Sequence, residues 1–296
     1  MASSTLASSF RNPEHSESNF AARSELFSCE GKERSMRNTR HGLSIAASLA
    51  AMIMIFMMTA VSAQERLKLA TEGTYPPWNY RDTSGKLVGW DIDIGNAICD
   101  RMKVQCEFIA QDWDGIIPGL NAKKYDLIVA SMGITAKRKE QVAFSNRYKE
   151  TISQFVARKG AIKDASPDGL AGKRIGVQRG SIQHDFLIKT YPKSEIVVYD
   201  KTTDVELDLL ADRVDLMLQN KLTSYSGFFK KPESADYEYV GPDLKGGLLG
   251  EGNGIAMRKE DTDLRDRVNK ALAEIIADGT YETISKKYFP FKLMGE

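Results

Sequence analysis

The chain has few of the residues that several kinds of function require. Its 296 residues contain three cysteines and three histidines, and none of them falls into the spacing of a metal site or a Ser-His-Asp arrangement. The formal net charge is +1, which provides no attraction to nucleic acid or to an acidic membrane surface. With 9 prolines and 23 glycines, the composition is that of an ordinary globular protein. We therefore expect no metal, no cofactor and no nucleic-acid partner, and any specificity must lie in a local site.

A long apolar run near the start of the chain is typical of a targeting segment. A basic stretch begins at Met36, small and apolar residues follow, and a small-residue pattern closes at Ala63. This order predicts a signal peptide at 36–63, with 1–35 as an upstream extension outside the fold. A retained transmembrane anchor is the alternative. Residues 64–296 hold 35 basic and 35 acidic side chains, so the mature chain is neutral.

Strand-like and helix-like patterns alternate through the rest of the chain. Alternating apolar residues at 67–71 predict a strand, and apolar residues at 92–98 recur at helical spacing. Repeated strand–helix order predicts an α/β fold with mainly parallel sheets. Further strands are expected at 104–110, 126–130, 172–177, 195–199 and 215–218, and extended runs at 153–158 and 255–258. Further helices are expected at 113–122, 183–190, 205–213, 261–277 and 281–288.

Two extended segments, at 153–158 and 252–258, frame the second series of elements. We expect 64–152 together with 252–296 to form one lobe. Residues 153–251 are expected to form a second lobe inserted within the first, joined to it by two extended crossings.

Cys99 and Cys106 remain in the expected mature chain, because Cys29 lies in the part that is removed. In an exported protein such a pair predicts a disulfide. Cys99 falls late in a helical pattern and Cys106 in the following strand, so the bond would join a helix to its neighbouring strand. A metal site with only two thiols is the alternative.

Four motifs, in this order along the chain, resemble the polar-amino-acid solute-binding proteins of ABC importers. They are TEGTYPPW at 71–78, GWDIDI at 89–94, DLIVASMGITAKR at 126–138 and ADGTY at 277–281. The resemblance covers essentially all of 64–296 and is greatest to histidine, lysine/arginine/ornithine and opine binders. It implies a two-lobe periplasmic binding protein fold that closes on its ligand. It also implies a periplasmic location, a membrane permease as partner and a monomeric protein.

The resemblance implies that Arg138 grips the ligand carboxylate, and a planar guanidinium suits bidentate contact with that group. Thr135 is a candidate N-cap just before it, and helix N–H groups there would also attract an anion. A surface arginine is the alternative. Gly133 replaces a frequent serine, so one side-chain hydrogen bond is expected to be missing. The neighbouring loop that the resemblance places at the ligand comprises Ala130, Ser131, Met132 and Gly133.

A loop of the second lobe matches one that donates N–H groups to the same carboxylate. It contains Gly180, Ser181 and Gln183, and a helix that starts near Ser181 would favour an anion there. A turn followed by a helix cap explains the same local sequence equally well.

Three aromatic residues and one acid complete the implied site. Tyr75 and Trp78 match an aromatic wall, and Trp113 matches an aromatic position of the opine binders. Glu72 matches an acid that meets the cationic end of the ligand. Core or rim aromatics and a solvated strand-end acid are the alternatives.

Asn220 departs from most amino-acid binders, which resemble this chain but carry an aspartate for the primary α-ammonium at this position. Asparagine keeps an acceptor and loses the charge, which weakens that contact by about 1–2 kcal/mol. This favours a ligand whose α-nitrogen is substituted, such as an opine. The resemblance therefore implies capture of an opine or related cationic amino-acid derivative for import.

Three other functions stay open. A plain basic amino acid (arginine, ornithine, lysine or histidine) is the alternative ligand. A dehydratase on the same fold would need a general acid or base in the cleft, whereas Ser181, Gln183 and Asn220 are neutral. His184 is expected on a helix surface and not as a base. A ligand sensor that docks to a membrane receptor is the third alternative, because its sequence would resemble that of a transport binding protein.

Overall fold

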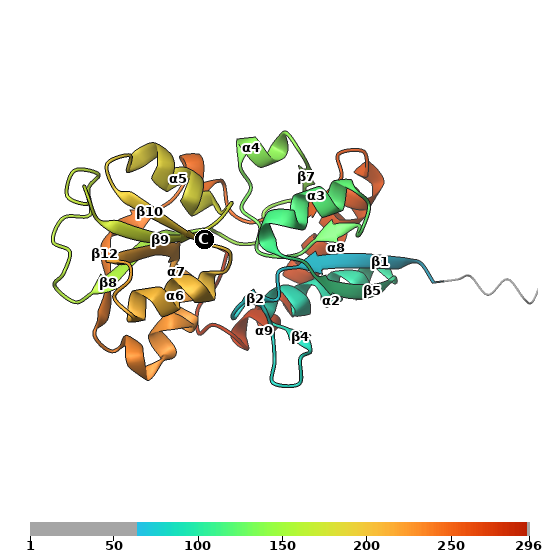
Figure 1. Cartoon of the computed structure of the whole chain (residues 1–296). Coiled ribbons are helices and arrows are strands. Elements are labelled where there is room, and N and C mark those ends of the chain that lie inside the picture. Colours follow the sequence, from blue (N-terminus) through green and yellow to red (C-terminus); the bar gives the residue numbers. More distant parts are fainter. Residues whose placement is uncertain (1–63, 295–296) are drawn as a thin grey trace, which may run out of the picture. The chain divides into compact units, whose positions relative to one another are not determined.

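A computed structural model of the chain describes residues 64–294, so the expected signal peptide and upstream extension lie outside the described residues. Ala63–Glu296 forms one compact unit. Its two five-stranded sheets belong to two lobes, each with its own helices (Figure 1). Within 64–294 we find no helix with the length and apolar character needed to cross a membrane.

The first sheet has the strand order β5-β1-β6-β13-β7. Strand β1 runs parallel to β5 and β6, and β13 runs antiparallel to β6 and β7. Because β13 comes from much later in the chain, the backbone returns to this sheet after completing the second one. The strands are β1 (Arg66–Thr71), β5 (Gln105–Ala110), β6 (Leu127–Ile128), β7 (Ala143–Phe144) and β13 (Ala256–Met257).

Helices of the first lobe pack on this sheet and on one another. Trp90, Ile94 and Ile98 line the buried side of α2 and share a core with Leu272 and Ile275 of α8. The helices are α2 (Trp90–Met102), α3 (Ile116–Asn121), α4 (Ala136–Lys139), α8 (Thr262–Ala277) and α9 (Thr280–Lys286). A small antiparallel sheet adds β2 (Thr74–Tyr75), β3 (Asn79–Arg81) and β4 (Leu87–Val88).

The second sheet has the order β10-β9-β11-β8-β12. Strands β10, β9 and β11 are parallel, and β8 is antiparallel to both β11 and β12. Its strands are β8 (Ser153–Arg158), β9 (Arg174–Gln178), β10 (Glu195–Tyr199), β11 (Leu216–Asn220) and β12 (Tyr237–Leu244), and its helices are α5 (Ile182–Thr190), α6 (Thr202–Leu210) and α7 (Lys221–Ser226). These elements lie between β7 and β13 in the chain, which confirms the predicted two-lobe α/β fold with the second lobe inserted in the first.

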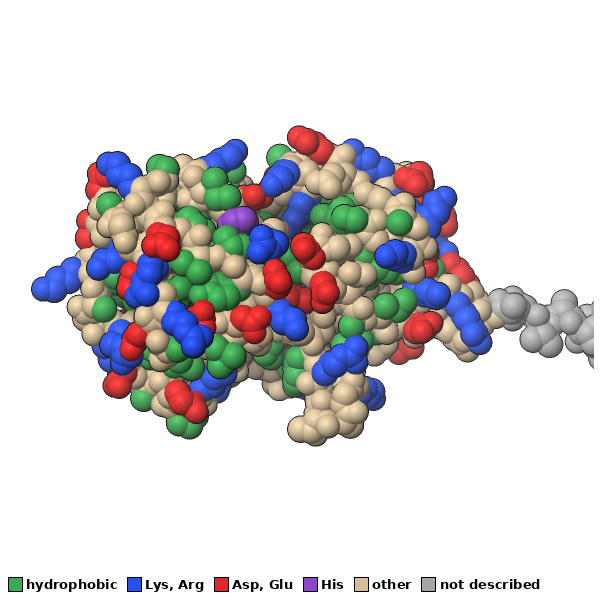
Figure 2. Space-filling model, in the orientation of Figure 1, with side chains coloured by type: hydrophobic (Ala, Val, Ile, Leu, Met, Phe, Trp, Pro, Cys, Tyr) green, Lys and Arg blue, Asp and Glu red, His purple; other side chains and the backbone are tan. Residues whose placement is uncertain are grey.

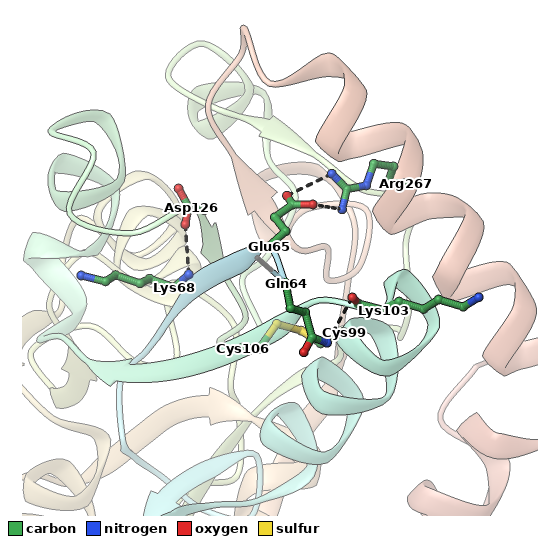
Figure 3. Close-up of a disulfide and its surroundings, with 8 residues drawn as sticks. All are labelled: Gln64, Glu65, Lys68, Cys99, Lys103, Cys106, Asp126 and Arg267. Carbon is green, nitrogen blue, oxygen red and sulfur yellow. Dashed lines mark hydrogen bonds and ion pairs between the residues drawn. A yellow bond between two sulfur atoms is a disulfide. The ribbon is translucent and has the colours of Figure 1, made fainter. Parts of the chain in front are cut away.

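The predicted disulfide is present and joins the predicted elements. Cys99 of α2 bonds to Cys106 of β5, with 6.2 Å between their Cα atoms. Figure 3 shows the bond near the first described residues, where Gln64 donates to the carbonyl of Lys103 and Glu65 pairs with Arg267. These contacts fix the entry of the described chain to α2 and α8.

Some predicted elements differ in length or are divided. The expected helix at 113–122 is a 3₁₀ turn at Trp113–Gly115 followed by the short α3, because Pro118 and two glycines interrupt it. The expected strand at 126–130 is reduced to Leu127–Ile128, and the residues after it form a site loop. The small sheet, α7 and β12 were not predicted.

Candidate ligand-binding site

A cavity between the two sheets contains most of the residues that the sequence singles out. It encloses about 420 Å³ of space not filled by protein atoms, part of it open to solvent. The first lobe contributes Glu72, Tyr75, Trp113, Ala130, Ser131, Gly133, Arg138, Lys149, Thr151 and Asn253, and the second contributes Gln178, Ser181, Ile182, Gln183 and Asn220. Three expected residues, Trp78, Met132 and Gly180, are not among those that line it.

Arg138 enters the cavity from the single turn of α4. Its backbone N–H donates to the side chain of Thr135, so the expected N-cap is present. Arg138 is 8% exposed, and its guanidinium donates to the carbonyls of Gly133 at 3.0 Å and Gly180 at 3.2 Å. Burial lowers the pKa of Arg138 to about 10, which leaves the side chain charged. No carboxylate within 64–294 forms an ion pair with it, so its charge is available to an external anion.

The loop before α5 differs in one respect from the expected anion site. Ser181 caps α5 by accepting the N–H of His184 at 3.0 Å. The N–H of Gly180 is directed to Nδ1 of His184, and its carbonyl accepts from Arg138 and from Nε1 of Trp113. Gly180 therefore contributes its carbonyl, not its N–H. The amides of Ile182 and Gln183 begin the helix and have no partner within it.

Glu72 at the end of β1 is the acid of the cavity. It is 7% exposed and accepts from Thr74 at 3.0 Å and from Gln178 of the second lobe at 2.6 Å. Burial raises its pKa to about 7, and the two hydrogen bonds oppose that shift only in part. A cationic group entering the cavity would stabilise the carboxylate form.

The aromatic residues take two different positions. Tyr75 and Trp113 line the cavity, and the ring of Trp113 lies 5.2 Å from the guanidinium carbon of Arg138. Trp78 is fully buried in the core of the first lobe, 4.8 Å from the ring of Phe289. Its interior position differs from the expected aromatic wall.

Asn220 ends β11 and lines the cavity, but its oxygen is already occupied. Oδ1 accepts the backbone N–H groups of Leu222 at 2.9 Å and Thr223 at 3.3 Å, and so caps α7. Two amide donors at this atom identify it as the oxygen. The side chain therefore offers its NH₂ group to the cavity, whereas the sequence suggested that it would offer an acceptor.

Beneath the cavity, Asp91 holds the loop of Ser131 in place. Asp91 is fully buried and accepts from Asn79 at 2.8 Å, Ser131 at 2.9 Å and Tyr148 at 3.0 Å. Burial raises the pKa of Asp91, because these donors and a nearby lysine compensate only part of the lost solvation. The hydroxyl of Ser131 is thus directed at Asp91, and Ser131 has a positive φ of 48°.

Lys149 is a second buried cation that lines the cavity. It is 1% exposed, and its ammonium donates to Oδ1 of Asn253 at 3.0 Å and lies 3.8 Å from the centre of the Trp78 ring. Burial lowers the pKa of Lys149 to about 8. Thr151 donates to the same Asn253 oxygen, and the amide nitrogen of Asn253 donates to the carbonyl of Ser131.

Comparison with known proteins identifies the family. The bacterial extracellular solute-binding proteins, family 3, match residues 67–291. The chain belongs to this family. This solute-binding protein is 38% identical over 255 residues to the lysine/arginine/ornithine-binding periplasmic protein of Escherichia coli (strain K12), covering 84% of this chain and 98% of that protein. The result confirms the resemblance seen in the four motifs.

Two further similarities concern ligand and fold. This solute-binding protein is 30% identical over 292 residues to the octopine-binding periplasmic protein of Rhizobium meliloti, covering 83% of this chain and 98% of that one. The solved structure of an ancestral arginine-binding protein bound to arginine matches with a TM-score of 0.71 and 36% identity, over 76% of this chain and 99% of that chain.

Five lining residues of this solute-binding protein were missed by sequence reasoning: Lys149, Thr151, Gln178, Ile182 and Asn253. Ile182 lies within the loop at 180–183 but was not singled out, and Gln178 lies two residues before that loop. Lys149 and Asn253 lie in polar segments that read as surface loops. Both are buried, and the hydrogen bond between them joins segments far apart in the chain.

Proposed function

We propose that this solute-binding protein captures an opine or a related cationic amino-acid derivative in the periplasm and delivers it to the membrane permease of an ABC importer. The observation that carries the proposal is the buried guanidinium of Arg138, which has no carboxylate partner in 64–294. The same cavity holds the buried acid Glu72. A ligand with a carboxylate and a cationic group complements both side chains.

Asn220 supports an N-substituted ligand over a free amino acid. A primary α-ammonium needs acceptors, and the one side-chain acceptor of Asn220 caps α7. The octopine-binding relative supports the same choice, whereas the lysine/arginine/ornithine-binding relative supports a basic amino acid as the alternative ligand.

Capture by lobe closure is supported by side-chain contacts that join the lobes. Arg138 and Trp113 donate to Gly180, and Gln178 donates to Glu72. Only contacts made on closing bias an open–closed equilibrium, so a ligand that replaces or strengthens them favours the closed form. In this proposal the lobes are 64–152 with 252–296 and 153–251. The protein acts as a monomer after removal of a signal peptide at 36–63.

A ligand screen by thermal unfolding tests the proposal. Arginine, ornithine, lysine, histidine and their N-(1-carboxyethyl) derivatives are each added at several concentrations, and hits are titrated calorimetrically. Stabilisation should increase with ligand concentration and affinity. Glycine and glutamate serve as control ligands, and a preference for either over every cationic compound contradicts the proposal.

One observation favours a catalytic alternative. A buried carboxyl whose pKa is about 7, as in Glu72, can serve as a general acid, as a dehydratase on this fold would require. Product analysis by NMR after prolonged incubation separates the two functions. Recovery of unchanged ligand supports binding alone, and turnover that Glu72→Gln abolishes supports catalysis.

A further inference from the structure

Lys149, like Arg138, is a buried cation of the cavity with no direct ion pair in the described part of the chain. A lysine that is 1% exposed is rare in proteins unless it is paired. Its hydrogen bond goes to the neutral oxygen of Asn253, and within 64–294 no carboxylate lies in ion-pair distance of it. The face of Trp78 stabilises the ammonium without neutralising it.

The charge of Asp91 acts on Lys149, but its oxygens accept hydrogen bonds from other side chains. Three neutral side chains, those of Asn79, Ser131 and Tyr148, donate to the two carboxylate oxygens of Asp91. Asp91 lies outside the cavity lining, whereas Lys149 is part of it. The ammonium has three donors, and Asn253 uses one of them. A cavity-lining cation with unused donors is suited to an anionic group of the ligand.

The backbone places Lys149 close to the arginine that receives the first carboxylate. Asn253 forms isolated antiparallel bridges with Gly133 on one side and with Lys149 on the other. Neighbouring extended segments are about 4.8 Å apart, so Gly133 and Lys149 flank Asn253 within about 10 Å of each other. The guanidinium of Arg138 donates to the carbonyl of Gly133. Two cations thus approach one region of the cavity from adjacent segments.

We propose that Lys149 binds a second ligand carboxylate, so that the ligand is an N-carboxyalkyl amino acid with two carboxylates on carbons that share one nitrogen. This inference rests on the proposed function and deepens it. The α-ammonium and α-carboxylate of a free amino acid together have no net charge. In the N-carboxyalkyl amino acid, one secondary ammonium lies between two carboxylates, and these three groups together carry a charge of −1. Asn220 offers no free acceptor for a primary ammonium, which agrees with substitution at the nitrogen.

The decisive experiment compares matched ligand pairs on three proteins by calorimetric titration. Each pair is a basic amino acid (arginine, ornithine, lysine or histidine) and its N-(1-carboxyethyl) derivative. The proteins are wild type, Lys149→Met and the control Lys86→Gln, which changes an exposed lysine of the β3–β4 turn. Methionine retains most of the length of the side chain and its apolar character but removes the charge.

The wild type should bind a dicarboxylate at least about tenfold more tightly than its parent amino acid. Lys149→Met should weaken binding of that dicarboxylate about thirtyfold or more, and binding of the parent amino acid less than threefold. Lys86→Gln should resemble wild type with both ligands.

The outcomes separate this inference from the proposed function. Binding of a basic amino acid as tightly as its dicarboxylate, or equal weakening of both by Lys149→Met, overturns the role of Lys149 but leaves solute capture intact. If no member of any pair binds, both proposals fall. Should Lys149→Met fail to fold, as judged by its thermal transition without ligand, the wild-type affinity ratio still decides. A ratio near one overturns the inference.

Discussion

The side-chain oxygen of Asn220 accepts the backbone N–H of Leu222 at 2.9 Å, at the first turn of α7. One residue thus ends a strand, caps a helix and presents its NH₂ group to the ligand cavity. An aspartate could cap α7 with one oxygen and present the other to the cavity. Asparagine and aspartate at position 220 would therefore both cap α7, but they would present different groups to the ligand.

Asn220→Asp should shift the ligand preference toward primary amino acids. The added carboxylate oxygen accepts from an α-ammonium, and a charge-assisted bond exceeds a neutral one by about 1–2 kcal/mol, or about tenfold in affinity. Calorimetric titration with arginine and its N-(1-carboxyethyl) derivative measures the shift. Asn220→Ser, which retains a helix cap without the charge, is the control. An unchanged ligand ranking in the aspartate variant contradicts the argument from Asn220.

Much of the fold could be predicted because local patterns agree with the final packing. The predicted strand at 195–199 has the bounds of β10, and the extended run expected at 153–158 has the bounds of β8, which belongs to the second sheet. Each contains a short apolar run, at 155–157 and 196–199, that is visible in the local sequence. The helix at 113–122 was predicted less well, since Gly115, Pro118 and Gly119 weaken its interior and divide it.

Only part of the candidate site could be predicted from the sequence. Arg138, Glu72 and Asn220 could be found because each lies within or beside a recognisable motif. Lys149 could not, because its contacts are with residues distant in the chain, Asn253 at a separation of 104 residues and the ring of Trp78. The hydrogen-bond directions at Gly180 and Asn220 were also beyond the sequence, since they depend on which backbone amides point toward each group.

Arg138→Ala should abolish ligand binding, with affinity reduced about a hundredfold or more. Removing a buried group that pairs with a ligand carboxylate leaves that carboxylate unpaired and typically costs about 2–5 kcal/mol. Calorimetry measures the affinity, and Lys137→Ala is the matched control, because Lys137 precedes Arg138 on α4 but is exposed and pairs only with Asp185. An affinity of Arg138→Ala within about tenfold of wild type would refute the site.

Affinity for a cationic ligand should rise with pH up to about pH 7. Burial raises the pKa of Glu72 from 4.5 to about 7, so at pH 6 most of the ligand-free protein holds Glu72 protonated. Binding a cation requires the carboxylate form, and one pH unit below the pKa reduces affinity by up to about tenfold. The charge of Asp112 raises the pKa of Glu72 and that of Lys201 lowers it, and both effects are smaller than that of burial.

Glu72 should also affect stability without ligand. Between about pH 4.5 and 7 the native state holds a proton on Glu72 that the unfolded state has lost, so this group makes the protein less stable as pH rises through that interval. Glu72→Gln should remove both dependences. Calorimetry and urea unfolding from pH 5.5 to 7.5 measure them, and a variant that keeps the wild-type pH profile of affinity contradicts the assignment.

Replacing the disulfide should reduce stability without changing the site. The bond between Cys99 and Cys106 has a sequence separation of 7, and the chain-entropy estimate for so short a loop is about 2 kcal/mol. The double variant Cys99→Ser/Cys106→Ser should therefore unfold at a lower urea concentration, with ligand affinity within about twofold of wild type. Both cysteines lie on the side of the first lobe where β5 meets α2, and neither lines the cavity. Wild type unfolded in the presence of reductant is the matched control and should approach the variant. Loss of ligand binding at a temperature where the variant is folded would show that the disulfide positions the site as well as stabilising the lobe.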